Sequence, residues 1–554
     1  MQSKKTILIW IFPLATLLLG FALYRQMAPI YSNMAGFDQD PAYVYLLSGL
    51  GLLEGYMPSH VDHPGTPLQV LVAFVIALKW VVMTAFGFEK ELLVASVIGG
   101  PEGYIQATSM GLLTITCMAQ FYIGIRILKY TRNLALAIFA QTTPIGFAVV
   151  VPNIVYLSPE ALLFATSLVF MGVAAPLLFQ RQALSDDNLN KIKIQLGLVC
   201  GFGIAVKLTF IPLLGVLLLL GSTRRVLGSL KFVAVALAIC LLPIAGRIPF
   251  LVKWSYSLIT QSGLHSSAGG FSEILAAAGK SVNVFLHSYP LYYAVGFVLC
   301  TIILFNLLYS LFCAVTSVLT AGQPKGETFN RIRTLVAKKS IELSVPLCLL
   351  VVMLVHTAMI LKYPLPRYLI PSLPIGFMGA IWIVKYFSSQ QYAGVRTNIL
   401  SLPLLGVGLI TAVAAAFNAY QSLEIARTNS AQVMQKIDEA ILSRSDSLVF
   451  GTYGCNSLKC ALSFGLSYNA SLVEKSEAYL SNFGLYNIWD KTLYVYGVGK
   501  LLPQQADDLV SSGREILIIT PVSDRVNKFI TEPINVGPTQ SVYRVLGIKQ
   551  GIDE

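Results

Sequence analysis

Long apolar runs without a single acidic or basic residue recur along this chain of 554 residues and constrain its fold most strongly. A helix needs roughly 20 apolar residues to cross the hydrocarbon layer of a bilayer. Only 12% of all residues are charged, whereas a soluble domain carries about 25%. The sequence therefore predicts a polytopic α-helical membrane protein. The uncharged runs are Ile7–Tyr24, Gly103–Ile125, Asn133–Pro159, Ala161–Gln180, Ser281–Pro324, Leu343–Leu361, Tyr368–Val384 and Thr397–Leu423.

These runs predict about 11 transmembrane helices in an integral, multi-pass protein of a plasma or inner membrane. Cytoplasmic ends of membrane helices collect lysine and arginine. With the amino end in the cytoplasm, 18 basic residues of the range 1–423 lie at inner helix ends and nine at outer ends. The predicted spans are 7–24, 104–125, 134–151, 160–179, 194–206, 209–221, 232–249, 291–315, 342–361, 368–385 and 398–418.

Residues 25–103 form the first outer loop in this topology. Pro67–Phe86 is apolar enough to span the membrane, but counting it would move the basic group Arg126–Arg132 to the outer side. We therefore expect Pro67–Phe86 to lie in the outer interface as an amphipathic helix. Asp40–Leu53 is a second expected interfacial helix, with Asp40 as its cap and Pro41 at the first helical position.

The chain divides into a transmembrane domain, residues 1–423, and a polar tail, residues 424–554. Short β-branched and aromatic runs separated by helical stretches predict a small α/β domain in the tail. An odd number of spans places this domain outside the cytoplasm. The expected strands are Ser447–Tyr453, Thr492–Tyr496 and Glu515–Thr520, with a helix near Pro503–Ser512.

Two features of the tail concern covalent processing. Asn469-Ala-Ser471 fits the acceptor triplet for N-glycosylation. Cys455 and Cys460 are the only cysteines in the tail. They are as compatible with a local disulfide in an oxidising compartment as with two unpaired thiols.

The net charge of +12 does not indicate a nucleic-acid partner, because of where that charge lies. Residues 1–423 hold 27 basic and 13 acidic residues, whereas residues 424–554 hold 12 and 14. The excess belongs to the membrane domain, where loop charge sets orientation. The expected surroundings are membrane lipids, and no nucleic acid is expected as a partner.

Gly36–Gln69 concentrates titratable residues beside the membrane, among them Asp38, Asp40, Asp62 and His63. Such residues are expensive to bury unpaired near lipid, so a cluster indicates a functional site. Sugar transfer from a lipid phosphate needs a base for the acceptor hydroxyl and a cation for the leaving phosphate. The aspartates could supply the base, and basic residues near the outer boundary could supply the cation. From spacing alone, aspartates that only cap helices are the simpler interpretation.

Motifs in four places resemble the GT-C glycosyltransferase superfamily. The similarity is to bacterial relatives of protein O-mannosyltransferases and of the lipid A aminoarabinose transferase. It covers about residues 1–420, in the expected order. Asp40-Pro-Ala-Tyr43-Val-Tyr45 with Asp62-His63-Pro64 is similar to the pattern D-E-A-Y-Y-W … D-H-P-P. The other motifs are Ser158-Pro159-Glu160, the glycine-rich hairpin Gly203-Ile-Ala-Val-Lys207, and Arg367-Tyr-Leu-Ile-Pro371-Ser-Leu-Pro374.

The resemblance implies roles for individual residues. Asp40 takes the position of the catalytic base, while Pro41 replaces the second acid of the pattern, so that Asp38 is the candidate substitute. His63, Lys207 and Arg367 fall at positions expected to bind the donor phosphate. Tyr43, Asp62 and Glu160 fall at positions expected to line the acceptor and substrate pocket. Some GT-C enzymes use a divalent cation, which Asp38 and Asp40 could hold, but the resemblance to members that work without one implies a reaction without metal or other cofactor.

The sequence thus predicts a hexosyl- or pentosyltransferase with an inverting reaction at the outer membrane face. The donor is a polyprenyl-phosphate sugar, and the acceptor is a hydroxyl of a lipid, an envelope glycan or a protein. A transporter or flippase of a lipid-linked substrate is the main alternative, and it would more often show broken helices or repeated halves. A scaffold whose tail binds a partner is the second alternative.

Overall fold

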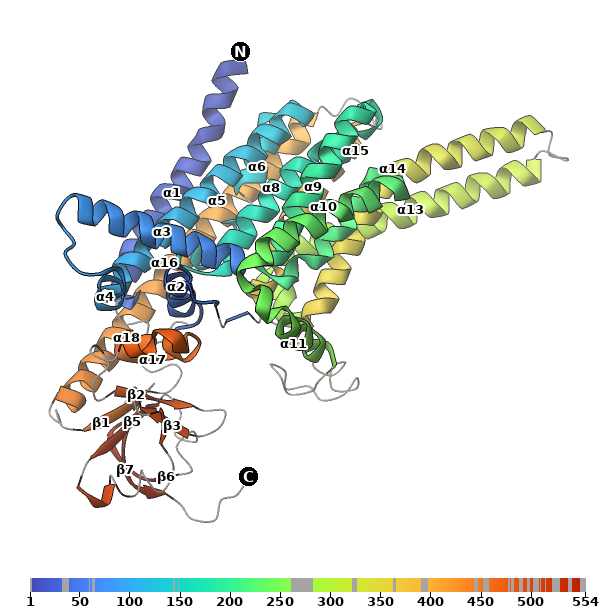
Figure 1. The fold of residues 1–554 in the computed structure, drawn as a ribbon. Helices are drawn as coiled ribbons and strands as arrows, with labels where there is room; N and C mark the ends of the chain where they lie inside the picture. Colours follow the sequence, from blue (N-terminus) through green and yellow to red (C-terminus); the bar gives the residue numbers. More distant parts are fainter. Residues whose placement is uncertain are drawn as a thin grey trace.

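The computed structural model consists of a bundle of long helices with a small sheet domain at one end (Figure 1). The start of the first helix lies at the opposite end of the bundle from that domain. The residues that the structure describes are 2–31, 39–58, 60–61, 65–142, 145–147, 149–260, 282–320, 326–361, 365–389, 397–442, 447–451, 458–476, 479, 483–487, 492–495, 499–501, 508, 510–513, 515–520, 529–536 and 541–548.

The membrane part consists of α-helices joined by short 3-10 helices. In chain order the main elements are α1 (Gln2–Tyr31), α2 (Gln39–Leu53), α3 (Thr66–Ala85), α4 (Leu93–Gly99), α5 (Pro101–Thr131), α6 (Leu134–Thr142), α7 (Val150–Val155), α8 (Pro159–Phe179), α9 (Asp186–Val206), η3 (Leu208–Leu220), α10 (Thr223–Leu241), η4 (Leu242–Arg247), α11 (Ile248–Thr260), α13 (Pro290–Thr320), α14 (Gly326–Ile360), η5 (Pro366–Ser372), α15 (Leu373–Ser389) and α16 (Thr397–Leu442).

Within the described residues, ten helices are long and apolar enough to cross a membrane, which confirms the polytopic fold. They include nine of the predicted spans. The predicted span 134–151 is instead divided between α6 and α7, and Gly146, a poor helix former, lies in the break. The predicted span 209–221 is the 3-10 helix η3.

The tenth helix of spanning length is α3, which the sequence assigns to the interface. Figure 1 shows α3 running crosswise to α5 and α8 rather than alongside them. The shorter helix α2 packs closely against α3, because Gly49 has no side chain. A Cβ at Gly49 would come within 2.6 Å of the Val72 side chain. The two helices are therefore in close contact, and α3 has the crosswise orientation expected of an interfacial helix.

Helix α8 lies at the centre of the membrane part. Within its most apolar stretch of 18 residues, 89% is buried inside the protein, more than for any other candidate span among the described residues. Polar side chains connect the surrounding helices: Gln120 and Gln141 each donate an amide N–H to the other's backbone oxygen at 3.1 Å. Gln141 also donates to the backbone oxygen of Ile9 at 3.0 Å. Such bonds between helices contribute to association in the membrane, where no hydrophobic force acts between them.

The tail forms a seven-stranded mixed sheet in the order β4-β3-β2-β1-β5-β7-β6. Strand β1 runs parallel to β2 and β5, and the other neighbouring pairs are antiparallel. All three predicted strands are present, so the small α/β domain is confirmed. Its elements are β1 (Leu448–Gly451), α17 (Leu458–Ser467), η6 (Ala470–Leu472), α18 (Val473–Ser476), β2 (Phe483–Asn487), β3 (Thr492–Val495), β4 (Gly499–Leu501), β5 (Ile516–Thr520), β6 (Phe529–Val536) and β7 (Ser541–Ile548).

Candidate functional site

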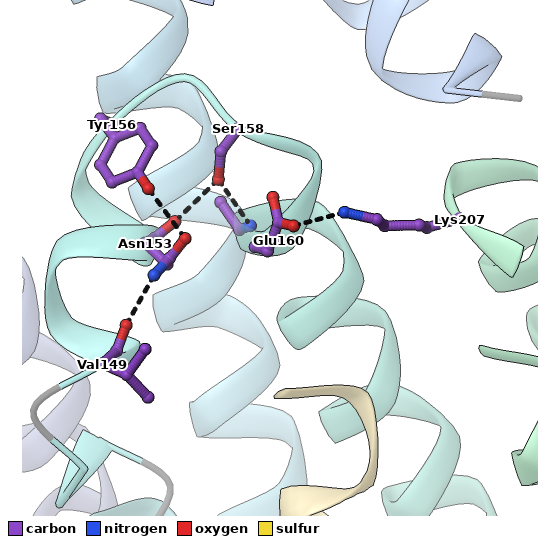
Figure 2. A network of polar contacts seen from close by, with 7 residues as sticks. Val149, Asn153, Tyr156, Ser158, Glu160 and Lys207 are labelled. Atoms are coloured by element: carbon purple, nitrogen blue, oxygen red, sulfur yellow. Dashed lines mark hydrogen bonds and ion pairs between the residues drawn. The ribbon is translucent and has the colours of Figure 1, made fainter. Parts of the chain in front are cut away.

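A buried ion pair joins the start of α8 to the end of α9. The ammonium nitrogen of Lys207 lies 2.5 Å from a carboxylate oxygen of Glu160, and both side chains are buried. Figure 2 shows the two side chains pointing toward each other from their separate helices. Two residues that the sequence motifs single out separately are therefore partners.

Local sequence explains where Glu160 lies. The Ser158 hydroxyl oxygen accepts a hydrogen bond from the Ala161 amide at 3.4 Å, so Ser158 is the N-cap of α8. Proline at the next position has the φ angle that a first helical residue needs. Glu160 follows in the first turn, where the helix dipole stabilises a negative charge.

A small polar network fixes this cap in turn (Figure 2). The Ser158 hydroxyl donates to the backbone oxygen of Asn153 at 3.1 Å. The Tyr156 hydroxyl donates to the Asn153 side-chain oxygen at 2.9 Å, and the Asn153 amide donates to the Val149 backbone oxygen at 2.6 Å. The turn between α7 and α8 is thereby held by side-chain bonds, which fixes the position of the Glu160 carboxylate.

Lys207 lies at the sharp turn between α9 and η3. Its backbone is extended, with φ −162° and ψ 137°, so the helix ends at Val206. The chain then turns back on α9, and Gly203 allows the Phe210 ring to pack at short distance. A Cβ at Gly203 would lie 2.7 Å from that ring. The glycine-rich hairpin ending in a lysine, predicted from the sequence, is therefore present.

A second cation, Arg367, comes from η5 between α14 and α15. The Tyr368 ring lies between the two cations, with its centroid 4.4 Å from the Lys207 ammonium nitrogen and 5.7 Å from the Arg367 guanidinium carbon. Arg367 also interacts electrostatically with the Glu160 carboxylate. The Tyr289 hydroxyl donates to the Pro366 backbone oxygen at 2.6 Å and anchors this segment. Glu160, Lys207 and Arg367 thus form one cluster.

The aspartates of the first loop are only partly described. Helix α2 begins at Gln39, so Asp40 lies in its first turn and not at the cap position before it. Its side chain lies outside the described part of the structure. Asp38, Asp62 and His63 lie outside the described residues altogether. Their predicted roles as base partner, pocket residue and phosphate ligand stay predictions.

Tyr43 lies one turn after Asp40 on α2 and is fully buried. Its hydroxyl has no hydrogen-bond partner among the residues that the structure describes. Burial, together with the negative charge of Glu102, raises the pKa of Tyr43 well above its usual value. The hydroxyl therefore stays protonated at physiological pH and can donate a hydrogen bond.

Glu102 is a candidate site residue that the motifs do not reveal. It lies in the first turn of α5, and its charge acts on Tyr43 and on Tyr24 of α1. The sequence gives one signal for Glu102: it stands directly before a long apolar run, Gly103–Ile125. Glu160 stands in the same way directly before the run Ala161–Gln180. Within the described residues, no group of three histidine, cysteine or acidic side chains is arranged to hold a metal ion.

The chain thus combines a polytopic helical bundle, a crosswise helix in its first loop, a buried acid–lysine pair and a small terminal α/β domain. Two solved structures with a similar overall fold are crystal structures of ArnT from Cupriavidus metallidurans, one bound to undecaprenyl phosphate and one in the apo state. This chain is 10% identical to each. The TM-scores are 0.54 and 0.53, over 96% and 95% of this chain and 97% of ArnT. The likeness confirms the predicted fold.

No protein-family model matches the chain, and no curated protein matches its sequence. At the level of sequence, the likeness is therefore limited to the short motifs described above.

Proposed function

We propose that this chain is a membrane glycosyltransferase that moves a sugar from a polyprenyl-phosphate donor to a hydroxyl acceptor. The observation that carries the proposal is the cluster of Lys207 and Arg367 around the Tyr368 ring, with Lys207 held by Glu160 at 2.5 Å. Two cations on a fold shared with a protein crystallised with undecaprenyl phosphate suit the phosphate of such a donor.

The cations would act on the leaving group. As the bond between the anomeric carbon and the phosphate oxygen breaks, both electrons stay with the oxygen and negative charge grows on the phosphate. Positive groups already in place stabilise that charge without reorganising. Arginine suits this role because its planar guanidinium binds phosphate through two parallel hydrogen bonds. Lysine acts as a point charge, and Glu160 would fix its direction.

The attacking group is the acceptor hydroxyl. We infer that Asp40 takes its proton while the hydroxyl oxygen forms a bond to the anomeric carbon from the face opposite the phosphate. The reaction inverts that carbon and needs only one base, because phosphate leaves readily. Asp38 is the proposed partner of Asp40.

Glu102 is a second candidate for the acid that Pro41 replaces, since it acts electrostatically on Tyr43, one turn from Asp40. His63 would join the phosphate ligands, and Asp62 the substrate pocket. In this proposal the site and the tail domain face the outer side of the membrane, with the amino end in the cytoplasm.

The transporter alternative receives less support from the helix ends near the cluster. Transporters often bind their substrate at discontinuous helices whose unwound backbone lies near the bilayer midplane. Here the chain reverses at Lys207, because Phe210 packs back against Gly203. The turn at Lys207 therefore joins the two arms of a hairpin, α9 and η3, and is not a break within one helix.

The proposal is tested with purified protein and a panel of polyprenyl-phosphate sugars, by measuring the release of free polyprenyl phosphate. We expect release with one donor class, reduced by Lys207→Met and unchanged by Lys253→Met, which removes an exposed lysine of α11. Movement of the lipid-linked sugar across a vesicle membrane without release would contradict the proposal and favour a transporter.

A further inference from the structure

The tail domain touches the helix that carries Asp40. Helix α17 packs against α2, and Figure 1 shows it lying between the sheet and the helix bundle. Gly465 permits the close approach, because a Cβ there would lie 2.8 Å from a Leu47 methyl carbon and 3.0 Å from the Tyr43 backbone oxygen. The contact therefore reaches the turn of α2 directly after Asp40.

Asn469, the second residue after the end of α17, forms hydrogen bonds on both sides of this contact. Its side-chain N–H donates to the Gly465 backbone oxygen at 2.9 Å, within the tail. Its side-chain oxygen accepts from the Ser48 hydroxyl of α2 at 3.2 Å. Asn469 and Ser48 are both buried. The asparagine of the glycosylation triplet is thus occupied in packing and is not accessible for a glycan in this fold.

Tyr468 contacts the second motif-bearing part of the first loop. Its ring lies edge-on to the His60 ring, with centroids 5.2 Å apart. His60 packs in the same manner on Tyr45 of α2, at 5.4 Å. Its backbone oxygen accepts a hydrogen bond from the Gln69 side chain of α3 at 2.8 Å. His60 comes two residues before Asp62, so one corner of the tail touches α2 within the first motif and the chain just before the second motif.

Contacts at the exposed rim of the interface between the tail domain and the membrane part contribute less to its stability. Lys475 forms an ion pair with Glu54, and its side chain is 41% exposed. Tyr479 donates to a Glu91 carboxylate oxygen at 3.3 Å, in an exposed position. Exposed ion pairs contribute little, whereas an unsatisfied buried polar group is costly. The buried corner Gly465–Asn469 is therefore the part of the interface that fixes geometry.

We propose that the corner Gly465–Asn469, hereafter the tail corner, positions α2 and the segment after it for the transfer reaction. Asn469 and Tyr468 are positioning residues, acting through Ser48 and His60. The inference rests on the proposed function. Lys207 and Arg367 are held by α9 and η5, outside this interface, so disturbing the tail corner should slow turnover without weakening the binding of polyprenyl phosphate.

The test compares Asn469→Ala, Ser48→Ala and their double variant in the full-length protein, with Lys475→Ala as the rim control. We expect Asn469→Ala to lower kcat about tenfold, which is the scale of one buried hydrogen bond left unsatisfied. The Kd for polyprenyl phosphate should stay within about twofold. The double variant should be no slower than the slower single variant, because both remove the same bond. Lys475→Ala should leave kcat within about twofold.

A second readout does not depend on turnover. Amide hydrogen exchange of residues 43–53 should accelerate in Asn469→Ala, while exchange in α8 and α9 stays at the wild-type rate. Unchanged exchange in α2 would overturn the positioning role whatever the kinetics. Equal loss of polyprenyl phosphate binding and turnover would overturn it as well. A wild-type protein without turnover would contradict the proposed function, and hydrogen exchange would then decide the positioning role separately.

Discussion

Glu160 and Lys207 form a buried 2.5 Å ion pair although 47 residues separate them in the chain. Each stands where a helix meets a turn: Glu160 in the first turn of α8, Lys207 directly after α9. Removing one partner of a buried pair leaves an uncompensated charge, which is far more destabilising than replacing both. The pair therefore ties the geometry of the proposed phosphate site to the stability of the membrane core.

Glu160→Gln should destabilise the protein by about 3–5 kcal/mol, because it leaves the Lys207 ammonium buried without its carboxylate. Thermal unfolding in detergent measures the change. The matched control is Asp186→Asn, which likewise removes the acid of an ion pair, here with Arg225. The Asp186 side chain is 83% exposed. The control should change stability by about 1 kcal/mol or less. Equal losses of stability in the two variants would contradict the assignment of Glu160 and Lys207 as a buried ion pair.

Arg367→Lys should weaken the binding of polyprenyl phosphate about tenfold, because lysine keeps the charge but loses the planar pair of donors. Lys207→Met should weaken it at least as much. Titration of polyprenyl phosphate by calorimetry or fluorescence gives the Kd of each variant. If Arg367→Lys binds with wild-type affinity, the guanidinium does not contact the phosphate as proposed.

Tyr43→Phe should leave thermal stability almost unchanged, because the buried hydroxyl has no partner among the described residues and removing an unpaired buried polar group costs little. If the hydroxyl binds the acceptor, KM for the acceptor should rise while the Kd for polyprenyl phosphate stays constant. A rise in both would place Tyr43 in the donor site instead.

Tyr43 also gives a pH prediction. Its pKa is raised well above 10.0 in the folded protein, first by burial and then by the charge of Glu102. A raised pKa favours the protonated form on folding, so this contribution to stability is complete below pH 10 and is lost above it, as the unfolded state releases its proton. Wild type should therefore lose stability more steeply than Tyr43→Phe above about pH 10. If the stability of the two proteins falls in parallel as the pH rises, the result contradicts the buried environment of the Tyr43 hydroxyl.

Glu102→Gln tests the second carboxylate. If Glu102 takes over the function of the acid that Pro41 replaces, kcat should fall at least tenfold, the scale of general acid–base contributions being about 10²–10⁴. Glu91→Gln, which changes an exposed acid outside the proposed catalytic site, serves as the control. Wild-type kcat in Glu102→Gln would leave Asp38 as the remaining candidate.

The fold could be predicted largely because apolar length and turn chemistry act locally. The N-cap at Ser158 and the hairpin glycine at Gly203 have the structures that their sequence motifs indicate. Interruptions were harder to predict: a hydrophobic run gives no sign of whether it forms one helix, as expected for 134–151, or two short ones. The same limit explains why η3 was expected to be a spanning helix.

The candidate site could be predicted residue by residue but not as an arrangement. Glu160, Lys207 and Arg367 were each recognised from a motif, whereas their proximity depends on the packing of η5 against α8 and η3. Glu102 carries no motif, and its proximity to Tyr43 arises only when α5 packs on α2. The contact between Ser48 and Asn469 spans 421 residues, a separation at which sequence spacing carries no information.

The most direct test of the central claim is the release of polyprenyl phosphate from its sugar-linked form by purified wild type and by Asp40→Asn. The substitution removes the base but keeps the size of the side chain, so the protein should fold, retain polyprenyl phosphate binding and lose release. Release by wild type with one donor and its loss in Asp40→Asn would support both the reaction class and the base. Wild-type release by Asp40→Asn would contradict the base assignment, and no release by wild type with any donor and acceptor would contradict the glycosyltransferase account.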